Sequence, residues 1–115
     1  MYQFLYSEIV QDEPGEARRR EREAFDTALV LMLKAEPKGT GSLEAIRALH
    51  FLQQLWSILI DDLCNKENDL PATIKAGLIS IGLWVGREID SLRSARVTSF
   101  ASLIEINQMV RDGLK

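Results

Sequence analysis

Apolar residues recur at intervals of three and four along most of the chain, which is the spacing of one face of an α-helix. Four segments carry this pattern, and they predict helices at about 14–36, 42–65, 70–95 and 99–112. No segment alternates cleanly between apolar and polar residues, as a half-buried strand does. The pattern therefore predicts an all-α, four-helix bundle-like domain.

Residues that begin and end helices lie between these segments. Ser42 fits the N-cap of the second helix, because its hydroxyl can accept a hydrogen bond from a free amide of the first turn. The third helix is predicted to begin at Asp69 or Leu70 and the fourth at Thr98 or Ser99. The short connections are those of a helix bundle.

The same spacing predicts which residues face the core. They include Leu43, Ile46, Leu49, Leu52 and Leu55 in the second helix, Ile74, Leu78, Ile81, Val85, Ile89 and Leu92 in the third, and Leu103, Ile106, Met109 and Val110 in the fourth. In the third helix Leu83 and Trp84 lie off this stripe. That helix is therefore apolar on more than one side, which indicates a central helix or one that something else partly covers.

The most apolar part of the third helix is the run LISIGLWV, from Leu78 to Val85. The uncharged stretch around it, Ala76 to Gly86, is about half of the roughly 20 residues that a membrane-spanning helix needs. The first residues, MYQFLYSEIVQDE, lack the basic start and the long apolar centre of a signal peptide. We therefore expect no membrane segment. The run belongs to a core helix, which either packs only within the bundle or also offers a surface to a partner.

Composition and charge narrow the class of protein. A chain of 115 residues with 46% hydrophobic and 27% charged residues fits a single soluble domain, residues 1–115. Its net charge is −3, and the arginines within residues 16–23, three of which are adjacent, are accompanied by interleaved glutamates, so direct nucleic-acid binding is disfavoured. One cysteine excludes an internal disulfide framework and fits a cytoplasmic location.

No group of residues indicates catalysis. His50 is the only histidine, which excludes a histidine-based metal cluster, and we expect it packed or at the boundary of the core. Asp61 and Asp62 are adjacent on a helix, so their side chains diverge and we expect both at the surface. Cys64 is expected to pack as a small apolar residue. We expect no enzyme, no cofactor and no metal.

The first dozen residues are too apolar for a frayed tail. They carry Tyr2, Phe4, Leu5, Tyr6, Ile9 and Val10. We therefore expect an arm, residues 1–12, that docks on the bundle and buries apolar surface there.

Two tryptophans and two glycines suggest where a partner would bind. Gly82 and Gly86 have the spacing that lets helices approach closely, and we interpret it as a seat for a bulky neighbour, such as Trp56 or Phe51. Core burial is the default for Trp56 and Trp84, and the alternative is that they border a groove for an amphipathic helix. The residues of this hypothetical partner-binding groove are Leu52, Leu55, Trp56, Leu59, Leu83 and Trp84.

Five stretches of the chain resemble one known family. They are MYQFLYSEIV, ALHFLQQLWSILIDDL, the ENDLP loop, LISIGLWVGREID and MVRDGLK, and the likeness runs from Met1 to Lys115. They are similar to the FlaF family of flagellar biosynthesis regulators of alphaproteobacteria. The resemblance implies a cytoplasmic factor that promotes flagellin production and export, opposite the translational repressor FlbT, with chaperone-like association with flagellin as the simplest mechanism. It implies no particular binding residues.

Three interpretations stay open for the apolar residues that lie outside the core-facing stripes. In the first, an apolar groove binds a terminal segment of flagellin, which is amphipathic and unpaired before assembly. In the second, the protein acts on flagellin messenger RNA or on an FlbT-type regulator without stable flagellin binding. The net negative charge of the protein disfavours direct binding to the RNA. In the third, the excess is the interface of a homodimer.

Overall fold

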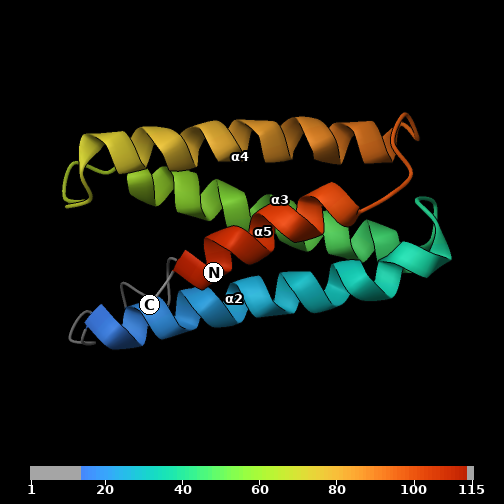
Figure 1. The fold of residues 1–115 in the computed structure, drawn as a ribbon, viewed down its shortest axis with the longest axis horizontal. Helices are drawn as coiled ribbons and strands as arrows, with labels where there is room; N and C mark the ends of the chain where they lie inside the picture. Colours follow the sequence, from blue (N-terminus) through green and yellow to red (C-terminus); the bar gives the residue numbers. More distant parts are fainter. Residues whose placement is uncertain (1–13, 114–115) are drawn as a thin grey trace.

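The computed structural model describes residues 14–113, which form a bundle of four α-helices (Figure 1). The helices are α2 (Pro14–Ala35), α3 (Leu43–Leu63), α4 (Ala72–Arg93) and α5 (Ala101–Gly113), and a single 3₁₀ turn, η1 (Glu36–Lys38), follows α2. This confirms the all-α prediction, since none of the described residues is in a strand. The predicted arm, residues 1–12, lies outside the described part of the chain.

The helix α3 is the centre of the bundle. It packs against α2 on one side and against α4 on the other, and the shorter α5 packs mainly against α2 while it crosses α3 (Figure 1). The core lies where these helices meet. Its largest fully buried side chains are Phe25, Met32, Leu49, Leu52, Val85, Ile89, Leu92, Phe100 and Leu103.

Two of the three predicted helix starts need correction. Ser42 caps α3 as predicted, because its Oγ accepts a hydrogen bond from the Ala45 amide at 3.1 Å. The helix α4, however, begins at Ala72 with Pro71 at the N-cap, and neither Asp69 nor Leu70 caps it. The helix α5 begins at Ala101, later than Thr98 or Ser99.

The start of α5 is fixed by Glu36, the first residue of η1. The Phe100 amide donates a hydrogen bond to Oε1 of Glu36 at 2.6 Å, and the Ser99 hydroxyl donates one to Oε2 at 2.8 Å. Glu36 therefore satisfies an amide that precedes α5 and holds the connector between α4 and α5 against η1. Local sequence patterns could not predict this cap, because 64 positions separate Glu36 from Phe100.

Replacement of Glu36 by alanine tests this cap. We expect Glu36→Ala to lower the free energy of unfolding by about 0.5–2 kcal/mol, the usual cost of losing a helix cap. Glu36→Gln keeps one acceptor oxygen and should recover most of the loss. Urea unfolding followed by circular dichroism measures both, and a Glu36→Ala protein as stable as the parent would contradict the role of the cap.

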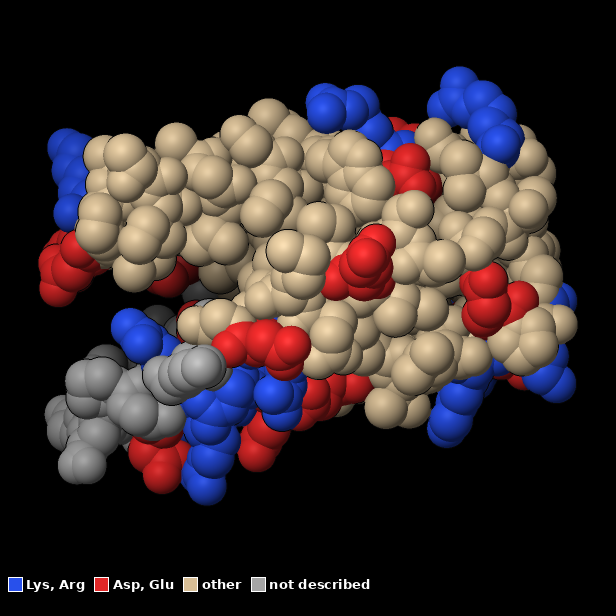
Figure 2. Space-filling model, viewed as in Figure 1, with Lys and Arg blue, Asp and Glu red and all other residues tan. Residues whose placement is uncertain are grey.

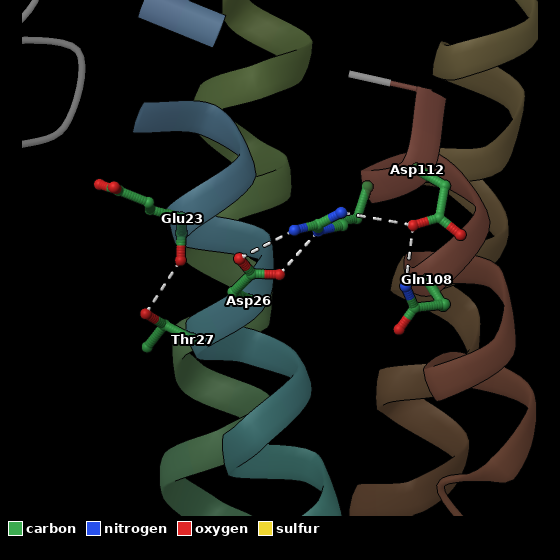
Figure 3. Close-up of polar contacts among 6 residues, drawn as sticks. Glu23, Asp26, Thr27, Gln108 and Asp112 are labelled. Atoms are coloured by element: carbon green, nitrogen blue, oxygen red, sulfur yellow. Dashed lines mark hydrogen bonds and ion pairs between the residues drawn. The ribbon is translucent and has the colours of Figure 1, made fainter. Parts of the chain in front are cut away.

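Two further polar contacts tie α5 to the rest of the bundle. In its middle, the buried Asn107 accepts a hydrogen bond from Nε1 of Trp56 at 2.8 Å and donates one to the Leu103 carbonyl at 2.7 Å. At its end, Arg111 donates to Asp26 of α2, with Nε 2.8 Å from Oδ1, beside the Gln108–Asp112 hydrogen bond (Figure 3). The hydrogen bond and the charge of Asp26 raise the pKa of Arg111. The short α5 is thus held at its start, middle and end.

The predicted inward stripes are correct for much of each helix and wrong at particular positions. In α3, Ala45 and Ala48 are buried, whereas Leu43 and Ile46 are exposed. Adjacent positions of a helix point about 100° apart, so Leu43 and Ile46 face outward when Ala45 and Ala48 face the core. In α5, Asn107 is fully buried while Met109 is 64% exposed, because the face around Leu103 and Asn107 points to the core. Cys64 and His50 are exposed rather than packed.

Candidate partner-binding surface

Three residues of the hypothetical groove belong to the core. Leu52 and Leu55 are buried, and Trp56 is only 2% exposed. The Trp56 ring makes an edge-to-face contact with Phe25, at 5.8 Å between ring centroids and an interplanar angle of 86°, while its indole N–H donates to Asn107. A buried indole with its donor satisfied is a structural anchor. These three side chains therefore do not line a groove, and the hypothesis is wrong for them.

The other three residues reach the surface but do not share one face. Leu59 and Trp84 are partly buried and pack against the core from its edge. Leu83 is 57% exposed. It follows Ile74 by nine positions, which is about half a turn out of phase at 3.6 residues per turn. Leu83 consequently faces away from the inward stripe of α4.

The inward stripe of α4 is covered along only half of its length. In the second half, Val85, Ile89 and Leu92 are buried. In the first half, Ile74 is 49% exposed, and no residue from 72 to 81 is buried. α3 is the main neighbour of α4, and in Figure 1 the first turns of α4 extend beyond the end of α5.

We call the part of this stripe that is not fully buried the α4 apolar surface. It consists of the exposed Ile74 and the partly buried Leu78 and Ile81, and the partly buried Trp84 follows on the same helix. The positions 74, 78 and 81 follow the i, i+4, i+7 spacing of one helix face. The sequence predicted these positions as a stripe, but only the structure shows where its cover ends.

Gly82 fixes how α4 lies on α3. A Cβ at this position would be 2.6 Å from Cδ1 of Ile60 and 3.1 Å from Cε3 of Trp56. The absence of a side chain thus seats Trp56, as predicted, and Ile60 beside it. Gly86 does not share this role, because a Cβ there would meet nothing within 4 Å. Since α3 and α4 are antiparallel, the residues of α4 before Gly82 run beside the part of α3 that follows Ile60.

The two glycines make a matched pair of variants. We expect Gly82→Ala to destabilise the protein by about 1–3 kcal/mol, because the added methyl overpacks a contact with a tryptophan ring that is held by Phe25 and Asn107. Gly86→Ala should instead stabilise it by up to about 1 kcal/mol, since alanine is the better helix former and the site is open. Thermal unfolding of both proteins compares them directly. Equal effects of the two substitutions would contradict the close packing at Gly82.

The α4 apolar surface carries no charge of its own. Between Ala76 and Gly86 there is no acidic or basic residue, and Lys75 donates through Nζ to the Asn68 carbonyl at 2.6 Å. Figure 2 shows an uncharged area over the first half of α4, with charged side chains only at its margins. Such a surface favours an apolar partner and gives little attraction to phosphate or to a charged ligand.

Residues 14–113 contain no cluster of three or more histidine, cysteine, aspartate or glutamate side chains that could hold a metal ion. Among the helices described, none combines the length and the apolar character that crossing a bilayer requires.

Comparison with known families settles which group of proteins the chain falls into. A family model described as flagellar protein FlaF matches residues 2–114. The chain belongs to the FlaF family. No curated protein and no solved structure matches it. The family match covers residues 2–13 of the sequence as well as the described helices α2 to α5.

Proposed function

We propose that this FlaF-family protein binds flagellin in a chaperone-like manner in the cytoplasm and thereby promotes flagellin synthesis and export. The observation that supports the proposal most directly is the α4 apolar surface. A stripe that is buried at Val85, Ile89 and Leu92 continues into a half that is only partly covered, where Leu78 and Ile81 are partly buried and Ile74 is 49% exposed. A surface of this kind on a flagellar protein is suited to an amphipathic helix of another chain.

A terminal segment of flagellin has the required chemistry. It is amphipathic, and before assembly it has no partner for its apolar face. Bound along α4, such a helix would bring its own apolar side chains against Ile74, Leu78 and Ile81, and the end of α3 would form the second wall. The bound flagellin would be protected from aggregation and premature assembly, which keeps it available for export.

Charge weighs against messenger RNA as the direct ligand. The arginines of residues 16–23 are the only basic cluster, and Arg19 forms an ion pair with Glu16 on the same helix. The net charge of −3 would repel a phosphate backbone. An FlbT-type regulator or a second copy of the chain would be a protein partner, and either would have to compete for the same apolar surface.

A set of titrations with purified components tests the proposal. Monomeric flagellin, the flagellin messenger leader and an FlbT-type regulator are each titrated into the protein and followed by calorimetry. We expect saturable binding of flagellin with a negative change in heat capacity, which marks apolar burial. Binding of the RNA or of the regulator without any binding of flagellin would overturn the proposal.

A further inference from the structure

The helix α4 has a second side, which faces away from the bundle. α4 lies at one edge of the fold, with α3 as its main neighbour, and no other described helix lies beyond it (Figure 1). Leu83, in the middle of this side, is 57% exposed. We call six residues that follow one another at three- and four-residue steps the outer face of α4, and all six are exposed: Thr73, Ala76, Ser80, Leu83, Arg87 and Asp90.

We propose that the outer face of α4 is the interface of a homodimer, in which α4 of a second copy packs antiparallel on it across a two-fold axis. This proposal does not rest on flagellin binding. A second copy bound here leaves the α4 apolar surface of both copies accessible, unlike a second copy bound at the α4 apolar surface itself. The contact is isologous, because each copy contributes the same six residues.

The spacing of the outer face fits a reversed copy of itself. The steps from Thr73 to Asp90 are three, four, three, four and three residues, which is the same sequence of steps in both directions. When one α4 is laid antiparallel on the other, Leu83 therefore lies opposite Ser80 of the second copy. Arg87 lies opposite Ala76 in the same way. Each larger side chain meets a smaller one, so the two helices can approach closely and interdigitate.

The charges at the ends of the outer face are complementary as well. The same pairing places Asp90 of each copy opposite Thr73, in the first turn of the other α4. That turn contains no acidic residue, and its N-cap, Pro71, makes no side-chain cap hydrogen bond. Free amides and the helix dipole make such an N-terminus a favourable neighbour for a carboxylate. Within residues 14–113 no side chain forms an ion pair with Asp90, and the two-fold axis makes the contact twice.

The charges also select the antiparallel orientation. A parallel pair of α4 helices would place Arg87 against Arg87 and Asp90 against Asp90, where like charges repel. Since the interface consists mainly of one pair of helices, it is small, and we expect a weak dimer that dissociates on dilution.

Sedimentation equilibrium of the full-length protein tests the dimer. The mass should rise with concentration from the 13.0 kDa of one chain towards twice that value. Leu83→Arg should weaken association at least about tenfold, because it brings two cations together beside the axis. Leu33→Arg, on a leucine of α2 that is 59% exposed, should leave association unchanged. Circular dichroism checks the fold of both variants. A single-chain mass at millimolar concentration of the parent protein would overturn the proposal.

The predicted charge contact can be tested by exchange. Thr73→Asp should not lower the melting temperature of the single chain, since an acidic residue in the first turn complements the helix dipole. It should nevertheless weaken the dimer, because it faces Asp90 of the second copy. Thr73→Asp/Asp90→Lys should restore association. Thr73→Asp/Asp61→Lys has the same net charge, with the lysine on an exposed position of α3, and should not restore it. Equal association of the two double variants would contradict the contact.

Disulfide trapping tests the orientation. In Cys64→Ser/Ala76→Cys/Arg87→Cys the new thiols lie opposite each other in an antiparallel pair and should oxidise to a covalent dimer. Cys64→Ser/Ala76→Cys should remain a single chain, because the two copies of position 76 would be about 16 Å apart along the helices. A disulfide requires Cα atoms within about 7 Å. Efficient cross-linking of the single-cysteine variant would indicate a parallel pair and would overturn the proposal.

The α4 apolar surface is the remaining place for a second copy. If Ile74→Ser/Leu78→Ser abolishes the dimer while Leu83→Arg does not, the second copy binds at that surface and the proposal is wrong. If the dimer depends on Leu83 but flagellin does not bind, the dimer interface stands and the proposed function fails.

Discussion

Replacement of Trp56 by alanine is expected to lower the free energy of unfolding by about 3–5 kcal/mol. The side chain is 2% exposed, contacts Phe25 edge to face and donates the hydrogen bond that satisfies Asn107. Its removal would leave a large cavity and an unsatisfied buried amide oxygen. Because total stability of a small domain is about 5–15 kcal/mol, the variant should be close to unfolding at physiological temperature.

Two comparisons identify the source of this loss. Trp56→Phe keeps most of the ring volume but removes the N–H donor, so it should cost less than alanine. Trp84→Ala should also cost less, because Trp84 packs at the edge of the core and is only partly buried. Urea unfolding followed by far-ultraviolet circular dichroism avoids the change in tryptophan signal. Equal losses at Trp56 and Trp84 would show that their environments do not differ as described.

The second large effect concerns binding. Ile74→Ser/Leu78→Ser should weaken flagellin binding about thirtyfold. This corresponds to about 2 kcal/mol, because the two apolar side chains that the partner would bury on binding are missing. The fold should persist, because neither side chain is fully buried. Isothermal titration with monomeric flagellin measures the affinity, and circular dichroism checks the helix content of the same samples.

An exposed leucine elsewhere provides the matched control. Leu33 on α2 is 59% exposed, and Leu33→Ser should leave flagellin affinity unchanged. Leu83→Ser tests the opposite face of α4 in the same way. If the Leu33 or Leu83 variant weakens binding as much as the double variant, the partner does not distinguish the α4 apolar surface from other exposed apolar residues.

The fold was largely predictable because helix periodicity is a local property. The stripe from Ile74 to Leu92 was correctly recognised as one face of a helix, and Ser42 as a cap. The extent to which other helices bury this stripe is not a local property. It depends on how the helices are placed against one another, and contacts such as that of Glu36 in η1 with the connector after α4 join residues far apart in the sequence. The sequence therefore predicts the stripe but not the point at which it becomes exposed.

The candidate groove failed for the same reason. Trp56 and Trp84 occupy comparable edge positions in their helices, and the sequence offers no way to tell them apart. What separates them is contact with distant residues: Phe25 and Asn107 close around Trp56. Asn107 itself was missed, because a polar residue gives no signal of burial until its hydrogen-bond partner is known. Leu83 was correctly expected off the inward stripe, but it was grouped with Trp84 in one groove although it lies on the opposite side of α4 from Ile74.

The central claim is that flagellin binds along the α4 apolar surface, and chemical-shift mapping tests it most directly. An unlabelled terminal segment of flagellin is titrated into the ¹⁵N-labelled full-length protein, and the shifts of all amides are followed. We predict the largest changes at residues 74–84 and around Leu59, with the Trp84 indole signal among them. Changes confined to α2 or to the outer face of α4, or no changes at saturating flagellin, would contradict the account.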